Sequence, residues 1–452
     1  MELSWKVRWS ETFSRNIAFW IVISHESLDS LGACRRQHSE KGIIWKQGCL
    51  SGLSKSMDMT KDRGNYRAQG CLPLIGIIGG GQLARMQAQA ASRLGCRIST
   101  IEKVLDCPAA DVVHTHQVGD WNDPAVLIPW AEGCDLVALE NEFVESATLH
   151  ALEQAGHTVV PTAKTMTIVQ DKWNQKEQLR KDGLPVTSFQ AVATIKDIHH
   201  AGTQVGWPLV LKKRKQGYDG KGNATIQNPE GVQNAWECLG SGTFPLYVEA
   251  FCPFNKELAV MVVRSVDGSH AEYPVVETMQ KDHICHVVTA PASISPELRD
   301  KASGIARGAV EAVKGLGCFG VEMFLTEDDD ILINELAPRV HNSGHYTIEA
   351  CRCSQFENHI RAILGWPLGD TSLVKPSAVM VNLLGKNDGP SLPSGITEAL
   401  QDPDAHLHIY GKPQSRKGRK MGHLTLTGEA QDKTLARAQQ LATSIHFGRK
   451  SS

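Results

Sequence analysis

The pattern of hydrophobic and polar residues changes about 72 residues into the chain. Residues 1–72 show no sustained period of 2 or 3.6 residues, which indicates a poorly ordered N-terminal extension. From residue 74 a short apolar run ends in three glycines at 79–81, and apolar residues then recur at helical spacing, at Leu83, Met86, Ala90 and Leu94. This pattern predicts a strand, a tight turn and a helix.

The alternation of strand and helix continues along the chain. Strand-like runs at 97–101, 135–139 and 157–160 predict an open parallel sheet in a first domain of residues 73–164. A second, mixed α/β unit is predicted for 165–370, followed by a small β-rich segment at 371–430 and a C-terminal helix or tail at 431–452. The elements predicted for the second unit are helices at 165–181, from about Pro229 and at 346–364, and strands at 208–212, 246–249, 257–263, 319–325 and 330–334.

Composition excludes two classes of protein. The chain has 452 residues, of which 47 are basic and 49 acidic, and the net charge of −2 gives no support for a general nucleic-acid binder. No apolar run approaches the ~18 to 20 residues that a membrane helix needs. The 12 cysteines are scattered without a Cys-x-x-Cys motif, so we expect reduced thiols in a cytoplasmic protein rather than disulfides or a zinc site.

The glycine turn is the first candidate for ligand binding. Residues 79–84 read Gly-Gly-Gly-Gln-Leu-Ala and match Gly-x-Gly-x-x-Gly/Ala, and Glu102 follows about twenty residues later at the end of the next predicted strand. Such a turn lets the backbone approach a phosphate at the positive end of a helix, as in nicotinamide-dependent oxidoreductases. A site for another anion and a purely structural turn are alternatives that this pattern leaves open.

A second glycine-rich segment follows the predicted strand at 208–212. Residues 212–223 read Lys-Lys-Arg-Lys-Gln-Gly-Tyr-Asp-Gly-Lys-Gly-Asn and combine cations with a flexible backbone. In such a loop, backbone amides and lysine ammonium groups can bind a polyphosphate, although the sequence is not a P-loop motif. The alternative is a solvated basic hairpin.

Two glutamates are candidates for a magnesium site. If the strands at 319–325 and 330–335 form a hairpin around the acidic turn at 327–330, Glu322 and Glu335 lie opposite each other on one face of the sheet. Opposed carboxylates need a positive partner, and an all-oxygen site beside phosphates suits magnesium. Two unrelated surface glutamates are the alternative.

Two polar segments complete the candidate chemistry. Residues 334–345 concentrate a carboxylate, an arginine, two histidines, two amides and a serine in a predicted loop, which is typical of a catalytic or ligand-binding loop and also consistent with a helix-capping turn. Residues 411–420 hold five cations and no acid, which favours a small phosphate ester over nucleic acid as the ligand.

Together these motifs resemble the ATP-grasp superfamily, and within it the 5-(carboxyamino)imidazole ribonucleotide synthetase family. The resemblance is carried by residues 79–83, 216–222, 334–345 and 418–423, and it covers residues 74–427, about four fifths of the chain. It implies an α/β ATP-grasp fold at 165–370, with a Rossmann-like pre-ATP-grasp domain before it and a small C-terminal β-rich domain after it. The segment at 418–423 separates this family from relatives such as biotin carboxylase.

The resemblance also implies which residues bind ATP and magnesium. Glu249 is implied near the adenine amine, Glu257 on the ribose, and Glu322 and Glu335 on magnesium; Gln280 stands where the family often has a histidine that contacts nucleotide. The residues implied for ATP are Lys172, Lys212, Gly217, Tyr218, Asp219, Gly220, Lys221, Gly222, Asn223, Glu249, Ala250, Phe251, Cys252, Glu257, Gln280, Asn334 and Glu335.

A ribonucleotide site and a catalytic loop are implied as well. Arg339, His341 and Asn342 are implied as the catalytic residues that handle bicarbonate and carboxyphosphate. Lys412 and Arg419 are implied on the 5′-phosphate of 5-aminoimidazole ribonucleotide. The whole implied set for this substrate is Gln82, Leu83, Glu140, Tyr218, Asp219, Lys221, Lys412 and Arg419.

The implied activity is a two-step ligation in purine (IMP) biosynthesis. ATP phosphorylates bicarbonate to carboxyphosphate, and the exocyclic amine of the ribonucleotide then captures the carboxyl group. The family suggests a homodimer. Some relatives are fused to a mutase domain, which this chain, ending at Ser452, is too short to contain, and functional coupling to a separate mutase is a further expectation. Ala84 departs from the glycine that many members have. The rival hypotheses are an ATP-grasp carboxylase or transformylase for another amine, a nicotinamide-dependent oxidoreductase, and a nucleotide-binding scaffold without turnover.

Overall fold

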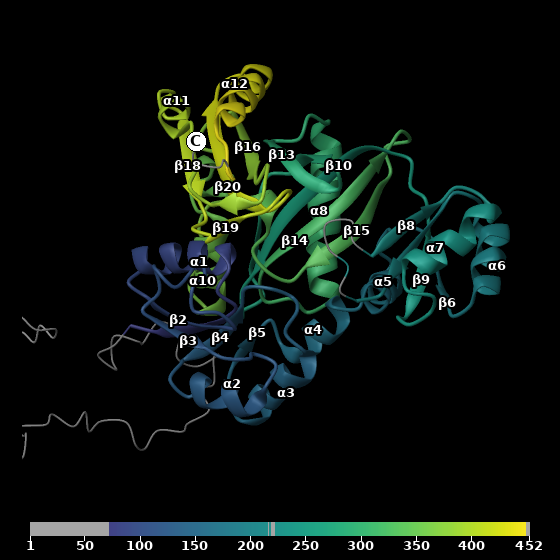
Figure 1. The fold of residues 1–452 in the computed structure, drawn as a ribbon, viewed down its shortest axis with the longest axis horizontal. Helices are drawn as coiled ribbons and strands as arrows, with labels where there is room; N and C mark the ends of the chain where they lie inside the picture. Colours follow the sequence, from purple (N-terminus) through teal and green to yellow (C-terminus); the bar gives the residue numbers. More distant parts are fainter. Residues whose placement is uncertain (1–71, 216, 218–221, 449–452) are drawn as a thin grey trace, which may run out of the picture. The chain divides into compact units, whose positions relative to one another are not determined.

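A computed structural model of the chain describes residues 72–215, 217 and 222–448 (Figure 1). The extension predicted for residues 1–72 lies outside these residues except for Leu72, and so does most of the glycine-rich loop. The described residues form sheets of five, four and nine strands and a two-stranded ladder.

The first sheet is parallel and has the strand order β3-β2-β1-β4-β5. This confirms the predicted open parallel sheet. The edge strand β3 is missing from the prediction because its side chains are mostly exposed. Because the order reverses between β1 and β4, the loops after these strands meet at a switch point, where open α/β sheets bind ligands. The elements are β1 (Leu74–Ile78), α1 (Gln82–Arg93), β2 (Arg97–Glu102), β3 (Thr115–Val118), α2 (Pro124–Ala131), β4 (Leu136–Leu139), α3 (Ser146–Gln154) and β5 (Val159–Val160).

Two helices follow where the sequence predicts one. α4 (Ala163–Val169) ends before Asp171, and α5 (Lys172–Lys181) begins directly after it. The Asp171 carboxylate accepts hydrogen bonds from the N–H groups of Trp173 and Asn174 and so caps α5. The single helix predicted at 165–181 is therefore wrong, and Lys172 becomes the first residue of a helix.

The second sheet is antiparallel, has the order β6-β9-β7-β8 and carries the glycine-rich loop between β7 and β8. Helices α6 and α7 pack against Leu209, Leu211 and Val248 on one face of it. The elements are β6 (Phe189–Val192), α6 (Ile195–Val205), β7 (Leu209–Lys213), β8 (Asn223–Ile226), η2 (Pro229–Gly231), α7 (Val232–Cys238) and β9 (Leu246–Ala250).

The third sheet has the order β15-β14-β10-β12-β13-β16-β20-β18, with β11 also paired to β10. Hydrogen bonds between β13 and β16 join residues before and after 370 in one sheet. The strands are β10 (Phe254–Arg264), β11 (His270–Glu272), β12 (Val276–Lys281), β13 (Ile284–Ala290), β14 (Gly317–Thr326), β15 (Ile331–Ala337), β16 (Ser377–Leu384), β18 (Ala405–Ile409) and β20 (Lys420–Gly428).

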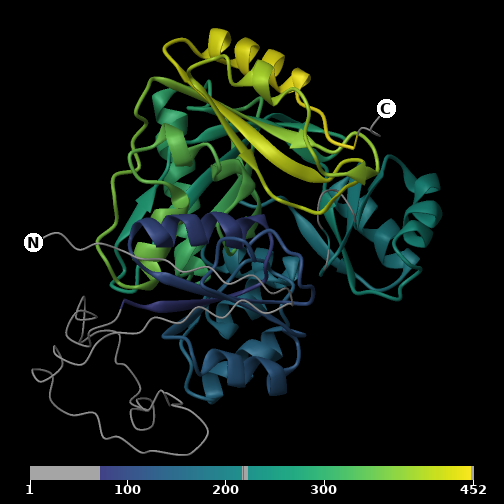
Figure 2. The ribbon, with the colours of Figure 1, turned by 60° about the vertical axis from the view of Figure 1, so that its left-hand side comes forward.

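Alternate residues of β10 belong to two different cores. Leu258 and Val260 pack with helix α8 (Pro296–Ala312), whereas Ala259 and Met261 pack with α10 (Gln355–Ile363) and with α1. The other side of α1 is buried against the first sheet. Helix α1 therefore joins the first sheet to the third, as Figure 2 shows with α1 in purple.

The helix predicted at 346–364 is also interrupted. α9 (Thr347–Ala350) ends at Cys351, which is extended and bridges Leu373. The Ser354 side chain then accepts a hydrogen bond from the N–H of Glu357 and caps α10. One continuous helix is therefore wrong here. Its predicted end at Gly365 is correct, because Gly365 has a positive φ of 66°.

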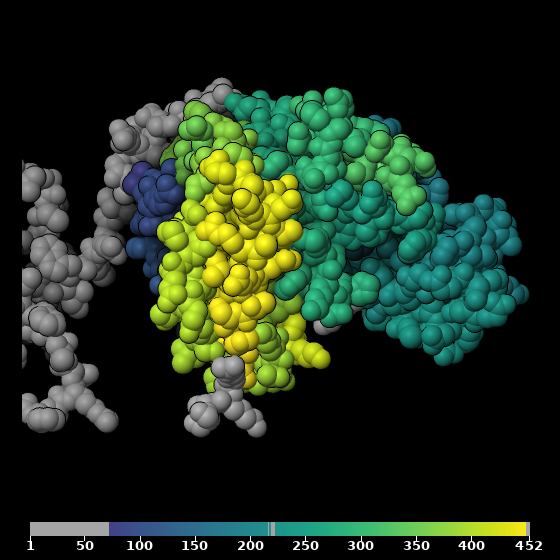
Figure 3. Space-filling view, turned by 90° about the horizontal axis from the view of Figure 1, so that it is seen from above, coloured from purple at the N-terminus to yellow at the C-terminus, as the bar shows by residue number. Residues whose placement is uncertain are grey.

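The C-terminal elements complete the third sheet. α12 (Gln431–Ser444) packs on β16 and β20, and Figure 3 shows it in yellow on the surface. Two short elements, α11 (Ile396–Ala399) and the ladder of β17 (Gly389–Pro390) with β19 (Gln414–Ser415), lie between the strands in sequence.

In the residues that the structure describes, no helix is long and apolar enough to cross a membrane. The described cysteines are free thiols, and all of them except Cys134 and Cys238 are buried.

Candidate active site

The acidic hairpin of β14 and β15 carries the two predicted metal ligands. Glu322 and Glu335 are direct partners in its ladder, as predicted. Closer to the turn the pairing is offset by one residue, with Met323 opposite Ile333, so Asn334 is an extra residue in β15. This β-bulge brings the two glutamates opposite each other.

The bulge also turns two consecutive side chains to the same face. Ile333 and Leu336 are both buried in the core that α8 covers, although residues three apart in a regular strand point to opposite faces. Asn334 and Glu335 lie between them and are both partly exposed. One irregularity therefore places Asn334 and Glu335 together with Glu322 on the face away from that core.

Charge is distributed unequally over the glutamate pair. Lys172 forms an ion pair with Glu335. Burial opposes ionisation of Glu335, but the attraction of Lys172 prevails and its pKa lies below the usual value. Glu322 instead faces His341, with 3.6 Å between Oε1 and Nε2, and burial together with Glu335 and Glu257 raises the pKa of Glu322 to about 8. A cation beside Glu322 would therefore be strongly favoured.

This donor set fits magnesium. Proteins usually hold magnesium with one or two carboxylates and with phosphate oxygens of a substrate. Within the described ranges, no group of three or more His, Cys, Asp or Glu side chains could hold a metal ion. A magnesium ion at this hairpin would therefore depend on Glu322, Glu335 and a bound nucleotide.

A buried ionic cluster surrounds Glu249 near the end of β9. Its carboxylate lies 3.1 Å from the Lys212 ammonium and 3.4 Å from that of Lys176. It also accepts hydrogen bonds from Tyr247 and Thr187, at 2.8 and 3.0 Å. Burial raises the pKa of Glu249, but the two lysines and the hydrogen bonds outweigh it and lower the pKa to about 2. The cluster fixes the ammonium group of Lys212, and the predicted contact of Glu249 with adenine stays a prediction.

The hinge at the end of β9 is more open. It comprises Glu249, Ala250, Phe251 and Cys252, and the Phe251 side chain is 42% exposed. Further along β10, Glu257 lies opposite Thr278 and accepts hydrogen bonds from Gln280 and Thr278. Gln280 therefore lies beside the carboxylate implied for the ribose. The nucleotide contacts of all these residues stay predictions.

The base of the glycine-rich loop is tied to the cap of α5. The N–H of Lys213 donates to the carbonyl of Gly222, which closes the loop at its base. Next to it, the Arg214 guanidinium contacts both carboxylate oxygens of Asp171. Gly217 and Asn223 are described at the two ends of the loop, whereas four predicted ligands lie outside the described residues: Tyr218, Asp219, Gly220 and Lys221.

The glycine turn after β1 is occupied by carboxylates. The N–H of Gly80 donates to Glu102 at 3.0 Å, and the N–H of Leu83 donates to Glu140 at 3.3 Å. A Cβ at Gly81 would lie 2.2 Å from Glu140, so this approach requires glycine. In a nicotinamide enzyme these amides would bind pyrophosphate, but here they have anionic partners. The turn instead holds the Glu140 carboxylate at the switch point of the first sheet, close to the partly buried Gln82.

Arg339 joins the polar loop after β15 to the first sheet. Two nitrogens of its guanidinium donate to the carboxylate of Glu142, in the loop after β4, and the Nη2 bond measures 2.9 Å. Burial opposes the charge of Arg339, but Glu142 raises its pKa above the usual value. Burial also raises the pKa of nearby Glu140 to about 7, although Arg339 counteracts the effect.

His341 and Asn342 follow in the same loop. Both the N–H and the carbonyl of His341 bond to the Gln355 amide on α10, at 2.9 and 2.7 Å. Burial, with Arg339 and Lys420, lowers the pKa of His341 to about 3, so the ring is neutral. Its Nδ1 accepts the N–H of Ser343, which leaves the proton on the Nε2 that faces Glu322. The structure thus brings His341 to the predicted metal site, whereas Arg339 pairs with Glu142 and the Asn342 side chain bonds to Asn382.

The two residues predicted for the ribonucleotide phosphate come from the C-terminal strands. Lys412 is 8% exposed and donates to the carbonyl of Lys420 at 2.6 Å, and Arg419 donates to the carbonyl of Gln414 at 2.8 Å. Tyr410, two residues before Lys412, shares a core with Leu83 of α1. This core brings the basic segment to the glycine turn, while its contact with a phosphate stays a prediction.

Three buried polar residues of this region are missing from the sequence prediction: Lys176, Gln355 and Asn382. A signal for Lys176 exists, because Lys172, Lys176 and Leu179 recur at i, i+4 and i+7 and so share one helix face. Gln355 and Asn382 have no local signal, since the residues that they hold lie 14 and 40 positions away.

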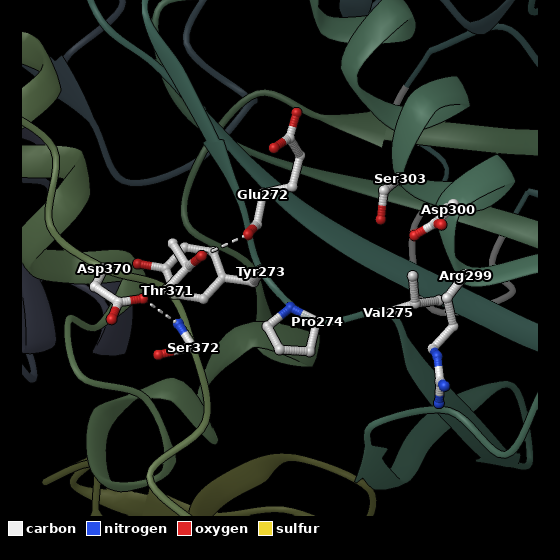
Figure 4. A pocket seen from close by; sticks show the side chains of 10 residues that line it. All are labelled: Glu272, Tyr273, Pro274, Val275, Arg299, Asp300, Ser303, Asp370, Thr371 and Ser372. Carbon is white, nitrogen blue, oxygen red and sulfur yellow. Dashed lines mark hydrogen bonds between the residues drawn. The ribbon is translucent and has the colours of Figure 1, made fainter. Parts of the chain in front are cut away.

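A cavity of about 400 Å³ lies apart from this cluster of predicted residues (Figure 4). It lies where α8 and the β11 to β12 connection approach the segment at 370–372, and no residue predicted from the sequence lines it. Its lining combines opposite charges on Arg299, Asp300 and Asp370. The predicted chemistry therefore gathers at the β14–β15 hairpin and not at this cavity.

Three family models match the chain in sequence order. They describe a ribonucleotide synthetase preATP-grasp domain at residues 72–170, an ATP-grasp domain at 177–356 and a phosphoribosylaminoimidazole carboxylase C-terminal domain at 378–437. The first match covers the first sheet, and the third covers β16 to β20 with part of α12.

Curated relatives and solved structures resemble the chain over most of its length. Phosphoribosylaminoimidazole carboxylase of Ogataea methanolica is 41% identical over 79% of this chain, which spans about two thirds (66%) of that relative. N5-carboxyaminoimidazole ribonucleotide synthase of Synechococcus elongatus is 41% identical over 82% of this chain and 93% of its own length. The crystal structure of an Aspergillus clavatus N5-carboxyaminoimidazole synthase with ADP and 5-aminoimidazole ribonucleotide has a TM-score of 0.76 and 35% identity, covering 82% of this chain and 98% of that one.

The order of the matched domains and the similarity to these relatives agree with the resemblance seen in the sequence motifs. Since the match to the Synechococcus protein spans nearly all of that protein, this chain belongs to the N5-carboxyaminoimidazole ribonucleotide synthetase family of ATP-grasp proteins.

Proposed function

We propose that this chain uses ATP and bicarbonate to carboxylate the exocyclic amine of 5-aminoimidazole ribonucleotide, which yields 5-(carboxyamino)imidazole ribonucleotide for purine (IMP) synthesis. The observation that carries the proposal is the contact of His341, in the polar loop after β15, with Glu322 of the Glu322 and Glu335 pair, while Arg339 of the same loop pairs with Glu142. The Aspergillus relative, whose structure holds ADP and this ribonucleotide, supports the choice of substrate.

The first step transfers a phosphoryl group to bicarbonate. A bicarbonate oxygen attacks the γ-phosphorus of ATP, the bond from this phosphorus to the bridging oxygen breaks, and ADP leaves carboxyphosphate behind. We expect the ammonium groups of Lys172 and Lys212, which pair with Glu335 and Glu249, to neutralise phosphate charge. Glu322 and Glu335, with Asn334, would hold magnesium, which supplies further neutralisation of the phosphates.

The second step forms the carbon–nitrogen bond. The amine nitrogen attacks the carboxyl carbon, the bond from this carbon to the phosphate oxygen breaks, and the amine loses a proton. Arg339 has five N–H donors, of which three bond to Glu142 and to the Val340 carbonyl. The other two bind the carboxylate or the departing phosphate. Carboxyphosphate hydrolyses readily, so we expect water to be excluded from the site during this step.

The proposal is tested by ADP release from the purified protein with ATP, magnesium and bicarbonate, in the presence and absence of 5-aminoimidazole ribonucleotide. We expect release that depends on the ribonucleotide, incorporation of ¹³C-bicarbonate into the product, and loss of both in Glu335→Gln. ATP binding without ribonucleotide-dependent release would refute the proposed substrate.

The same assay tests the metal. Treatment with EDTA should abolish ADP release, and added magnesium should restore it. Glu322→Gln should raise the magnesium concentration needed for half-maximal rate by about tenfold or more, since one of two carboxylate ligands is lost. An unchanged magnesium requirement in this variant would contradict the assignment of Glu322.

Two rival functions give different results in this assay. A carboxylase or transformylase for another amine would release ADP with that amine and not with 5-aminoimidazole ribonucleotide. A nucleotide-binding scaffold would bind ATP without turnover. The oxidoreductase hypothesis predicts NADH binding without ATP binding, and the carboxylate partners of Gly80 and Leu83 speak against it.

The proposal extends to partners and compartment. We expect a homodimer in solution, a mutase on a separate chain that consumes the unstable product, and a cytoplasmic location. Light scattering after size-exclusion chromatography tests the first expectation, and fractionation of cells tests the last. The relative from Vigna aconitifolia is named as chloroplastic, so a plastid fraction belongs in that experiment.

A further inference from the structure

Asn382 lies in the C-terminal strand β16 and contacts the predicted catalytic loop. Its side chain is buried, with 1% exposure, and none of the sequence motifs includes it. Its amide and that of Asn342 form a reciprocal pair. Nδ2 of Asn342 donates to Oδ1 of Asn382 at 2.9 Å, and Nδ2 of Asn382 donates to Oδ1 of Asn342 at 2.6 Å.

A third hydrogen bond fixes the direction of this pair. Nδ2 of Asn382 also donates to the main-chain carbonyl of Cys285 on β13, at 2.9 Å. A carbonyl is only an acceptor, so rotation of the Asn382 amide by 180° would place two oxygens against each other. Both N–H groups of Asn382 are therefore committed, one to Cys285 and one to Asn342, and its oxygen must face Nδ2 of Asn342.

The consequence falls on Asn342. The Asn342 oxygen is turned toward Asn382, and one of its two N–H groups is used in the pair. In a reciprocal amide pair the bonded N–H is the one on the oxygen side, so the second N–H points away from Asn382. The amide of Asn342 is thus held with an N–H donor on the side away from Asn382. A donor is what an anionic oxygen of bicarbonate or carboxyphosphate needs.

The same strand leads to the basic segment. In the ladder between β16 and β20, Asn382 lies opposite His423 and Leu384 lies opposite Lys420. Arg419, which is predicted to bind the ribonucleotide phosphate, directly precedes Lys420 in the chain. One pair of strands therefore carries both the residue that orients Asn342 and the end of the predicted phosphate site.

We propose that Asn382 is a positioning residue for the carboxylation: it holds the Asn342 amide so that an N–H group faces the carboxyl group that is transferred. This inference rests on the proposed function and deepens it, because it states how the carboxylating loop recognises an anion. Asn382 acts through Asn342 and does not itself touch the substrate.

The test is a double-mutant cycle with Asn342→Ala and Asn382→Ala, measured as ribonucleotide-dependent ADP release and as ADP released per ribonucleotide carboxylated. Since misplacement of a catalytic group by about 1 Å can cost about a hundredfold, we expect Asn382→Ala to lower kcat by about tenfold to a hundredfold. The KM for ATP should change less than about twofold, because ATP binding does not involve this pair. More ADP should be released per product.

The background of Asn342→Ala distinguishes positioning from general damage. There the added Asn382→Ala change should alter kcat less than about twofold, because the group that Asn382 orients is already gone. The isosteric Asn382→Asp variant keeps the volume but loses both donors, and it should likewise release more ADP per product. Thermal unfolding of both variants, with midpoints above the assay temperature, guards against a folding defect.

Asn358→Ala is the matched control. Asn358 is a fully buried asparagine that bonds to Tyr273 and Gly369 and makes no hydrogen bond to the catalytic loop within the described residues. Its loss should lower thermal stability and leave ADP released per product unchanged. The inference would be overturned if Asn342→Ala and Asn382→Ala lowered kcat independently, so that their effects multiplied. It would also be overturned if the ADP released per product were unchanged in Asn382→Ala and Asn382→Asp. A wild-type protein without ribonucleotide-dependent ADP release would instead refute the proposed function.

Discussion

Glu249 is the residue on which the buried charges near the hinge depend. It is 2% exposed and neutralises Lys176 and Lys212, which are 1% and 9% exposed. In Glu249→Gln two buried ammonium groups lose their counter-ion, so the free energy of unfolding should fall by about 3 to 5 kcal/mol in urea denaturation at pH 7. The ion pair of Lys256 and Glu277, whose side chains are 25% and 20% exposed, provides the control, because Glu277→Gln should cost less than about 1 kcal/mol. Equal costs would contradict this assignment.

The same residue makes stability depend on pH. Folding lowers the pKa of Glu249 from 4.5 to about 2. A carboxyl group with a lowered pKa stabilises the folded state above its unfolded pKa, and this stabilisation disappears as the pH falls from about 4.5 to about 2. Urea denaturation at several pH values should show this loss in the wild type and a shallower slope in Glu249→Gln. Parallel pH profiles would show that Glu249 is not the group responsible.

Gly81 is the residue that admits Glu140 to the glycine turn. In Gly81→Ala the new Cβ would displace the Glu140 carboxylate and its bond to Leu83, so we expect a loss of about 1 to 3 kcal/mol in stability and a higher KM for the ribonucleotide. At Gly304, inside α8, a Cβ would enter open space, with no neighbouring side chain within 4 Å. Gly304→Ala should therefore raise stability by about 0.5 to 1 kcal/mol with no change in KM. Thermal unfolding and steady-state kinetics measure both effects.

At the level of elements, Asp171 determines where α5 begins. Its carboxylate caps the helix and pairs with Arg214 at the base of the glycine-rich loop. Asp171→Ala should cost about 2 kcal/mol or more, since both the cap and a largely buried ion pair are lost, whereas Asp171→Asn keeps a capping oxygen and should cost less. Urea denaturation separates the two variants. An equal cost would mean that the cap contributes nothing.

The split helices and the hairpin show what the sequence could predict. β1, the glycine turn and α1 could be located from an apolar run, three glycines and apolar residues at helical spacing, because β1 is buried along most of its length and α1 has buried faces. The caps Asp171 and Ser354 were local signals, but helical periodicity on both sides masked them. The glutamate pair was predicted from a regular hairpin around the turn at 327–330, whereas the structure reaches the same pairing through the bulge at Asn334, so the offset near the turn was not predicted. The bonds of Gln355 and Asn382 could not be foreseen, because only the tertiary fold brings their partners close.

At the scale of the whole molecule, the third sheet joins the ATP-grasp region to the C-terminal strands. Because β13 and β16 are hydrogen-bonded neighbours, we expect the amides of β12 and β16 to exchange with similar opening free energies, within about 1 kcal/mol, in native-state hydrogen exchange. Exchange of β16 and β20 through a much lower-energy opening, with β10 and β14 still protected, would show that the C-terminal strands unfold independently.

The continuity of this sheet also limits how the chain can be recombined. A chimaera of two relatives joined near residue 370 would inherit β13 from one parent and β16 from the other. Residues paired across this seam, Thr289 with Val379 and Ala290 with Ala378, would then come from different parent proteins. The C-terminal segment is therefore not expected to be exchangeable between relatives on its own. A functional chimaera should also take β12 and β13 from the parent that supplies the C-terminal strands. We therefore expect residues that face each other across the seam to covary among relatives.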